Sequence, residues 1–163
     1  MSQPSDTAAW ADGHSFLGQI YLRKDHAWVP VHTQAIHYDL SFGVDVESES
    51  GWLQTGGSAP AAVFQFRFHS RASERLHYRV SLAADSTRRL GAVKNGYLGL
   101  YSPDEAANFW KLQPLEWAPN QLRCLFRDHL GHQVKTEPIK GKRGAYLTIG
   151  AGEMHEYLIK RAH

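Results

Sequence analysis

A short phrase recurs three times in this chain and restricts its fold more than any other feature of the sequence. In each copy a Leu follows an aromatic residue, a polar turn comes next, and an alternating apolar strand closes the unit; the copies are centred on Leu53, Leu98 and Leu147. The central leucines are 45 and 49 residues apart. A period of this length is typical of folds in which one repeat is one supersecondary unit. The sequence therefore predicts a threefold array of β-hairpins.

The residues upstream of these hairpins repeat as well. Asp25, Asp85 and Asp128 each lie three residues after a Leu that ends an apolar run, and each precedes one copy of the hairpin. The first copy is the longest between the Asp and the central Leu, and residues 35–46 within it alternate between apolar and polar side chains. Since alternation favours a strand, we expect an extra strand in the first repeat.

Strand patterns dominate the rest of the chain. About a dozen short runs are alternating, β-branched or aromatic, and they are broken by Gly, Asp, Asn or Pro. The clearest is Phe64, Phe66 and Phe68, whose side chains share one face of a strand. Only residues 102–108 favour a helix, because a Ser can cap and a Pro suits the first position, and one turn is expected there.

Length and composition predict one globular domain. The chain has 163 residues, of which 42% are hydrophobic, and this is long enough to bury one core without disulfides. Residues 1–13 are rich in Ser, Asp, Ala and Pro and predict a loose N-terminal arm. Residues 14–163 then form the domain, with repeats of approximately 14–70, 71–118 and 119–163.

Charge and hydropathy limit the expected partners and location. The formal net charge of +2 is small and its Lys and Arg residues are dispersed, which argues against a nucleic-acid partner. No run approaches the roughly 18 apolar residues of a membrane span, and the N-terminus lacks the basic start and apolar centre of a signal peptide. We expect a cytoplasmic protein, or one exported without a cleaved signal peptide. The single cysteine, Cys124, lies in a strand pattern and is expected to be a buried, inert side chain.

Taken together, the three repeats resemble the β-trefoil superfamily. The segment Asn108-Phe109-Trp110 is a partial form of the Gln-x-Trp signature that closes each repeat in ricin-B-like lectins, and the Tyr-Leu hairpins are similar to those of fascin-like trefoils. The resemblance implies an all-β fold in which six strands form a short barrel and three hairpins cap it. A β-sandwich, which needs a similar number of strands, is the alternative.

The same resemblance implies a ligand site. In lectin-type trefoils an Asp near the end of the first strand accepts hydrogen bonds from vicinal sugar hydroxyls, which assigns that role to Asp25, Asp85 and Asp128. The supporting polar groups would be His26, Asn108 and His129. Charge-assisted hydrogen bonds of this kind are roughly twice as strong as neutral ones. The alternative is that each Asp is a turn residue whose side chain bonds its own backbone.

Three aromatic residues form a second candidate site. Trp52, Tyr97 and Tyr146 each precede the central Leu of a repeat, so their side chains point to the opposite side from it. They would form either an exposed threefold ring suited to stacking on a ligand or a packed cluster beneath the hairpins.

No catalytic motif is present in the sequence. It contains no nucleophile elbow, phosphate-binding loop, dinucleotide fingerprint or metalloprotease helix, and neighbouring residues such as His129 and His132 lack a dense set of further metal ligands. We therefore expect no enzyme activity, metal or cofactor. The sequence predicts a non-catalytic binding module whose partner is a carbohydrate or glycoprotein. The alternative is a protein-binding trefoil, such as a protease inhibitor, cytoskeletal binder or toxin-associated module, that acts through residues 102–108 and 140–143; the oligomeric state stays open.

Overall fold

The chain folds into antiparallel β-strands. The computed structural model describes residues 10–39, 45–56, 59–141 and 143–162. Within these ranges all regular secondary structure is strand, so the predicted all-β class is confirmed. None of the described segments forms a helix long and apolar enough to cross a membrane.

The described residues form thirteen strands. In chain order they are β1 (Phe16–Lys24), β2 (Ala27–Asp39), β3 (Asp45–Thr55), β4 (Val63–Ala72), β5 (Arg75–Leu82), β6 (Asp85–Lys94), β7 (Tyr97–Tyr101), β8 (Trp110–Ala118), β9 (Gln121–Arg127), β10 (Lys135–Pro138), β11 (Ala145–Thr148), β12 (Glu153–Met154) and β13 (Tyr157–Arg161). The runs expected from alternation at residues 16–22, 63–68 and 76–82 all lie within strands.

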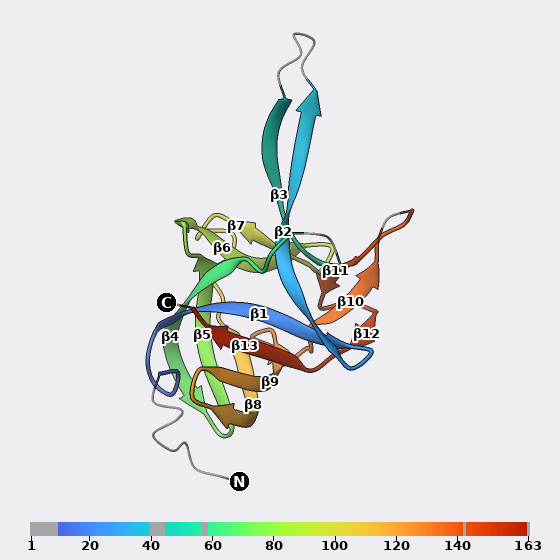
Figure 1. Ribbon diagram of the computed structural model, residues 1–163. Helices are drawn as coiled ribbons and strands as arrows, with labels where there is room; N and C mark the ends of the chain where they lie inside the picture. Colours follow the sequence, from blue (N-terminus) through green and yellow to red (C-terminus); the bar gives the residue numbers. More distant parts are fainter. Residues whose placement is uncertain (1–9, 40–44, 57–58, 142, 163) are drawn as a thin grey trace.

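Six of the strands close into a ring. β1 pairs with β4 and β13, β4 with β5, β5 with β8, β8 with β9, and β9 with β13, every pair being antiparallel. Each ring strand therefore has two hydrogen-bonded neighbours, and Figure 1 shows these strands surrounding a common interior below the remaining hairpins.

The interior of the ring is filled by side chains at alternate strand positions. Phe64 and Phe66 of β4 are fully buried, while the intervening Gln65 is half-exposed and Arg67 is exposed, as the two-residue period of a strand requires. The Phe66 ring stacks on Phe16 of β1 at a centroid distance of 4.8 Å, and Tyr78 of β5 packs edge-on against it at 6.0 Å. Aromatic residues from different strands thus share one core.

Six of the remaining strands form hairpins over one end of the ring. β2–β3, β6–β7 and β10–β11 are hairpins, and their second strands pair with one another: β3 with β7, β7 with β11, and β11 with β3. Leu53, Leu98 and Leu147, the central leucines of the recurring phrase, have no solvent-exposed surface. They bury the underside of the three hairpins against the core.

One hairpin projects well beyond the others. β2 and β3 pair from Val31↔Thr55 out to Asp39↔Asp45, with a register shift between Thr33 and Ala35, and they extend away from the ring in Figure 1. Of residues 35–46, where one additional alternating strand was expected, residues 35–39 lie in β2 and 45–46 in β3, while residues 40–44 lie outside the described part of the chain. The length of this hairpin explains the longer first copy of the repeat.

The start of the chain differs in part from the expected loose arm of residues 1–13. Residues 1–9 lie outside the described part of the chain, but Trp10 and Ala11 are buried. The indole N–H of Trp10 donates to the carbonyl of Ala118 at 3.2 Å, and the hydroxyl of Tyr78 donates to the carbonyl of Ala11. The aromatic side chain makes this segment part of the core, so the ordered domain begins before residue 14.

Candidate functional site

The six residues expected at the ligand site come from four different turns and loops. Asp25 and His26 form the two-residue turn between β1 and β2, with φ values of 50° and 68°. Positive φ at both central positions is characteristic of the type I′ turn, which suits the twist of a tight hairpin. Both side chains are exposed, so this turn leaves its polar groups open to solvent.

Asp85 begins β6 and is used by its own turn. Its Oδ1 accepts hydrogen bonds from the backbone N–H of Thr87 at 3.0 Å and from the hydroxyl of Thr87 at 2.6 Å. These two donors, the hydroxyl first, lower the pKa of the Asp85 carboxyl from its usual range. The contacts follow the alternative in which the Asp bonds the backbone two residues on.

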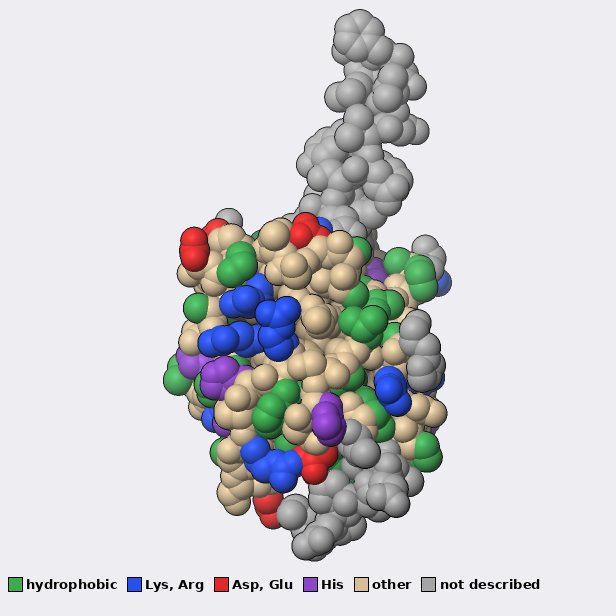
Figure 2. Space-filling model, turned by 90° about the vertical axis from the view of Figure 1, so that its left-hand side faces the viewer, with side chains coloured by type: hydrophobic (Ala, Val, Ile, Leu, Met, Phe, Trp, Pro, Cys, Tyr) green, Lys and Arg blue, Asp and Glu red, His purple; other side chains and the backbone are tan. Residues whose placement is uncertain are grey.

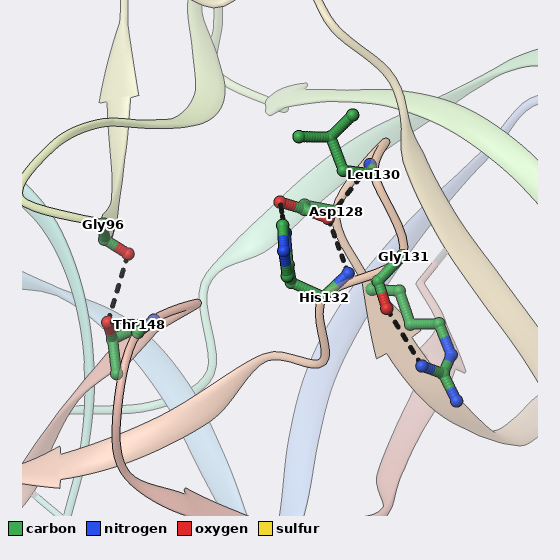
Figure 3. Close-up of polar contacts among 8 residues, drawn as sticks. Gly96, Asp128, Leu130, Gly131, His132 and Thr148 are labelled. Atoms are coloured by element: carbon green, nitrogen blue, oxygen red, sulfur yellow. Dashed lines mark hydrogen bonds and ion pairs between the residues drawn. The ribbon is translucent and has the colours of Figure 1, made fainter.

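Asp128 also bonds its own turn, and it accepts more hydrogen bonds there than Asp85 does. Its Oδ1 accepts from the backbone N–H groups of Leu130 at 3.0 Å and His132 at 2.8 Å, and its Oδ2 lies 3.0 Å from Nδ1 of His132 (Figure 3). A carboxylate has about four acceptor positions, so three are already engaged. Asp128 is only 4% exposed. It stabilises the 128–132 turn and leaves room for at most one further hydrogen bond.

Three of the six expected residues nevertheless meet in one pocket. Asn108, Asp128 and His129 line a depression of about 90 Å³, together with Glu105 and Phe109. Because a liquid water occupies about 30 Å³, the pocket accommodates a group the size of two or three hydroxyls. It offers an amide, an imidazole, a carboxylate and one face of an aromatic ring.

A single turn within residues 102–109 places the carboxylate of Glu105 and the amide of Asn108 at the pocket. The carbonyl of Ser102 accepts from the N–H groups of Glu105 at 3.0 Å and Ala106 at 2.9 Å. This is a hydrogen-bonded turn, and the one turn of helix expected in residues 102–108 does not form. Ala106 then packs on Gly91 so closely that a Cβ on the glycine would lie 2.8 Å from the alanine Cβ. Because Gly91 has no side chain, the loop can pack closely on β6, which places Glu105 at the pocket.

Sequence reasoning did not assign a role to Glu105 or Phe109. Phe109 lies inside the partial Gln-x-Trp signature, which could have pointed to it, whereas Glu105 was only one of several loop carboxylates. The Phe109 ring stacks on His69 at 4.8 Å and on His77 at 4.5 Å between centroids. The hydroxyl of Ser70 joins these histidines, at 2.7 Å from Nδ1 of His69 and 2.9 Å from Nδ1 of His77.

The electrostatic environment keeps one of these histidines neutral. Burial is the largest cause that lowers the pKa of His77, and the positive charges of Lys111 and Arg75 and the neighbouring His69 lower it further. A neutral imidazole stacks on Phe109 without the cost of burying a charge. The imidazole of His77 behind Phe109 is therefore uncharged near neutral pH.

His26 belongs to a second pocket, of about 220 Å³. The pocket lies over Leu158 of β13 and is walled by Trp28, Arg23 and Arg123. The guanidinium of Arg23 lies 5.9 Å from the centroid of the Trp28 ring, within the range of a cation–π contact. Asp85 lines neither of the two pockets, so the structure does not bring the three aspartates into equivalent surroundings.

The three aromatic residues of the repeated phrase converge. Trp52 lies 5.3 Å from both Tyr97 and Tyr146, and the two tyrosines lie 5.5 Å apart, measured between ring centroids. Each side chain is half-buried. The hydroxyl of Tyr97 donates to Glu137 Oε2 at 2.5 Å, and this hydrogen bond raises the pKa of Tyr97. The rings thus pack on one another and still present part of their surface to solvent.

No family model, curated protein or solved structure matches the chain. Roles for the pockets therefore follow from the chemistry of their own side chains. In the described part of the chain no group of three or more His, Cys, Asp or Glu side chains is arranged to hold a metal ion. The thiol of Cys124 is fully buried, so the expectation of a core cysteine is confirmed, and this burial raises its pKa.

Proposed function

We propose that this chain is a β-trefoil that acts as a non-catalytic carbohydrate-binding module. The trefoil assignment is supported by the six-stranded ring and by the three hairpins whose second strands pair in a triangle. It is also supported by connectivity, since each third of the chain contributes two ring strands and one hairpin, in the same order.

The observation that carries the ligand proposal is the meeting of Asn108, His129 and Asp128 with Phe109 in one pocket. An aromatic face packs on the apolar C–H face of a sugar ring, while amide, imidazole and carboxylate groups bond its hydroxyls. Asp128 has one acceptor position left, so we assign the main hydroxyl-accepting role to Glu105, which is exposed at the pocket. The volume suits one edge of a sugar ring with its hydroxyls.

The number of sites is smaller than the threefold symmetry alone would give. The pocket at His129 is the first, and the pocket that joins His26 and Trp28 is the second. In this proposal Asp85 is not a ligand residue, and its carboxylate stabilises its own turn. Two weak sites on one chain still raise the affinity for a branched or repeating glycan, because the second contact forms at a high effective concentration.

The test is binding to an array of immobilised neutral mono- and oligosaccharides. We expect Asn108→Ala to weaken binding at least about tenfold, corresponding to about 1.4 kcal/mol. Asn120→Ala is the matched control, because Asn120 is also exposed but lines neither pocket, and it should bind as the unchanged protein does. Absence of binding to every glycan, or equal binding by both variants, would contradict the proposal.

The protein-binding alternative is favoured by one observation, the half-exposed cluster of Trp52, Tyr97 and Tyr146. Trp and Tyr are enriched among the residues that contribute most to protein interfaces. Of the two loops named for this function, residues 102–108 contribute Glu105, Ala106 and Asn108 to the proposed sugar pocket, and residues 140–143 lie only partly within the described chain. Retention of a protein partner by the unchanged protein and its loss in Trp52→Ala would favour this alternative.

A further inference from the structure

The outer face of β4, β5 and β6 carries three arginines that lie close together. Arg67 and Arg79 are directly opposite each other on β4 and β5, and Arg89 of β6 is opposite Ser81, two residues along β5 from Arg79. Since Phe66 and Val80 beside them point into the core, these arginines point outward. Figure 2 shows Lys and Arg side chains gathered on this face, with His side chains next to them.

This arrangement is unfavourable for the isolated protein. Residues directly opposite on antiparallel strands lie about 5 Å apart, and like charges in such pairs are destabilising. Within the described residues no carboxylate forms an ion pair with Arg67, Arg79 or Arg89. A bound anion would relieve the repulsion, so the face is electrostatically complementary to a negatively charged partner.

The residue type narrows the chemistry of that partner. Arginine presents a planar fork of donors that bonds two oxygens of one oxyanion at once, and it is more weakly hydrated than lysine. Three such groups on adjacent strands suit several oxyanions spaced along a chain. The basic field extends to β8, because the charge of Lys111 contributes to lowering the pKa of His77.

The arginine face is continuous with the pocket at Phe109. Arg89 immediately precedes Leu90 and Gly91, which line that pocket. On β5, His77 lies on the same outward face as Arg79 and stacks on Phe109 at 4.5 Å. A chain molecule that extends from the pocket across Phe109 and the histidines therefore reaches the arginines.

We propose that the pocket and the arginine face form one site for a sulfated glycan. The pocket takes the hydroxyl-bearing edge of one sugar, and Arg67, Arg79 and Arg89 bind sulfate groups on the neighbouring sugars. The inference rests on the proposed carbohydrate-binding function and specifies the ligand class of that site.

A glycan fits this surface better than a nucleic acid. Nucleic-acid grooves combine positive charge with aromatic rings on which successive bases stack. On β4 and β5 the outward neighbours of Arg67 and Arg79 are Gln65, His69, His77 and Ser81, none of which is a Phe, Tyr or Trp that successive bases would stack on. The carboxylate of Glu105 accepts bonds from sugar hydroxyls and repels any anionic group, so the pocket takes a sugar edge that carries no sulfate and the sulfates lie at the arginines.

The experiment measures affinity for a size-fractionated sulfated glycosaminoglycan oligosaccharide and for its desulfated form. We expect the sulfated form to bind at least tenfold more tightly, and the preference to weaken between about 50 and about 300 mM NaCl as the charges are screened. The double variant Arg67→Gln/Arg79→Gln should lose this preference and keep its affinity for the desulfated form. Arg89→Gln should lose part of it.

The matched control is Arg143→Gln/Arg161→Gln, which removes the same charge from two exposed positions outside the face. An equal loss of sulfated-glycan binding in both double variants, or equal or better binding of a single-stranded nucleic acid of similar charge, overturns the inference. If Arg67→Gln/Arg79→Gln changes nothing while Asn108→Ala abolishes neutral glycan binding, the inference fails and the proposed function stands. If no glycan of either kind binds, both fail.

Discussion

The three central leucines offer a quantitative test of how evenly the hairpins share the core. Leu53, Leu98 and Leu147 each have an exposed fraction of 0% and occupy the same position next to a ring of the aromatic cluster. Truncating a fully buried Leu to Ala removes its transfer free energy and leaves a cavity, which together cost about 3–5 kcal/mol. We expect each single substitution to lower the free energy of unfolding by about 3 kcal/mol, with values within about 1 kcal/mol of one another.

The assay is urea denaturation followed by intrinsic fluorescence, where stability changes shift the midpoint and leave the slope unchanged. In thermal unfolding a loss of about 3 kcal/mol lowers Tm by about 6–12 °C for a domain of this size. Leu130→Ala is the control, because Leu130 is 70% exposed and should change stability by no more than about 0.5 kcal/mol. A loss as small as the control's at any one of the three buried positions would refute the reasoning.

Three further predictions concern single residues. Asp128→Ala should lower the free energy of unfolding by about 3 kcal/mol, because it removes a buried acceptor of several hydrogen bonds, and a stable variant with weakened glycan binding would contradict this. Gly144→Ala should be more destabilising in urea than Gly141→Ala, since both have positive φ but only at Gly144 would a Cβ lie 2.2 Å from the carbonyl oxygen of Thr55. For His77, the folded-state pKa lies below the unfolded value of 6.5, so the unfolded chain binds the proton more readily. The free energy of unfolding therefore decreases as the pH falls from 7 through 6.5 toward the folded-state pKa. Denaturation of His77→Gln at pH 7.5 and 5.5 should show a smaller loss than the unchanged protein, and an equal loss would exclude His77 as its source.

The strands could be predicted from the sequence because their alternation records which side chains face the core. Phe64 and Phe66 have the predicted orientation, and the convergence of Trp52, Tyr97 and Tyr146 follows from their equal positions in the repeated phrase. Both results depend on local periodicity. The location of Trp10 in the core could not be predicted in this way, because it depends on a contact with the distant Ala118.

The candidate site was predictable only in part. Asn108 and His129 carry sequence signals, and the fold brings them together in one pocket. The sequence could not show whether each Asp carboxylate bonds the backbone of its own turn or a ligand, because both roles favour Asp. The arginine face was also hidden, because Arg67 and Arg79 become neighbours only through the register of β4 and β5.

Closure of the six-stranded ring has a consequence for how this surface can change. Because both edges of every ring strand are already occupied by a neighbour, an outward side chain is not needed to protect an edge from foreign chains. Phe66 and Arg67 are adjacent along the chain, yet Phe66 packs in the core and Arg67 is exposed on the outer face. Outward positions are thus free to be exchanged for new ligand specificities at little cost in folding.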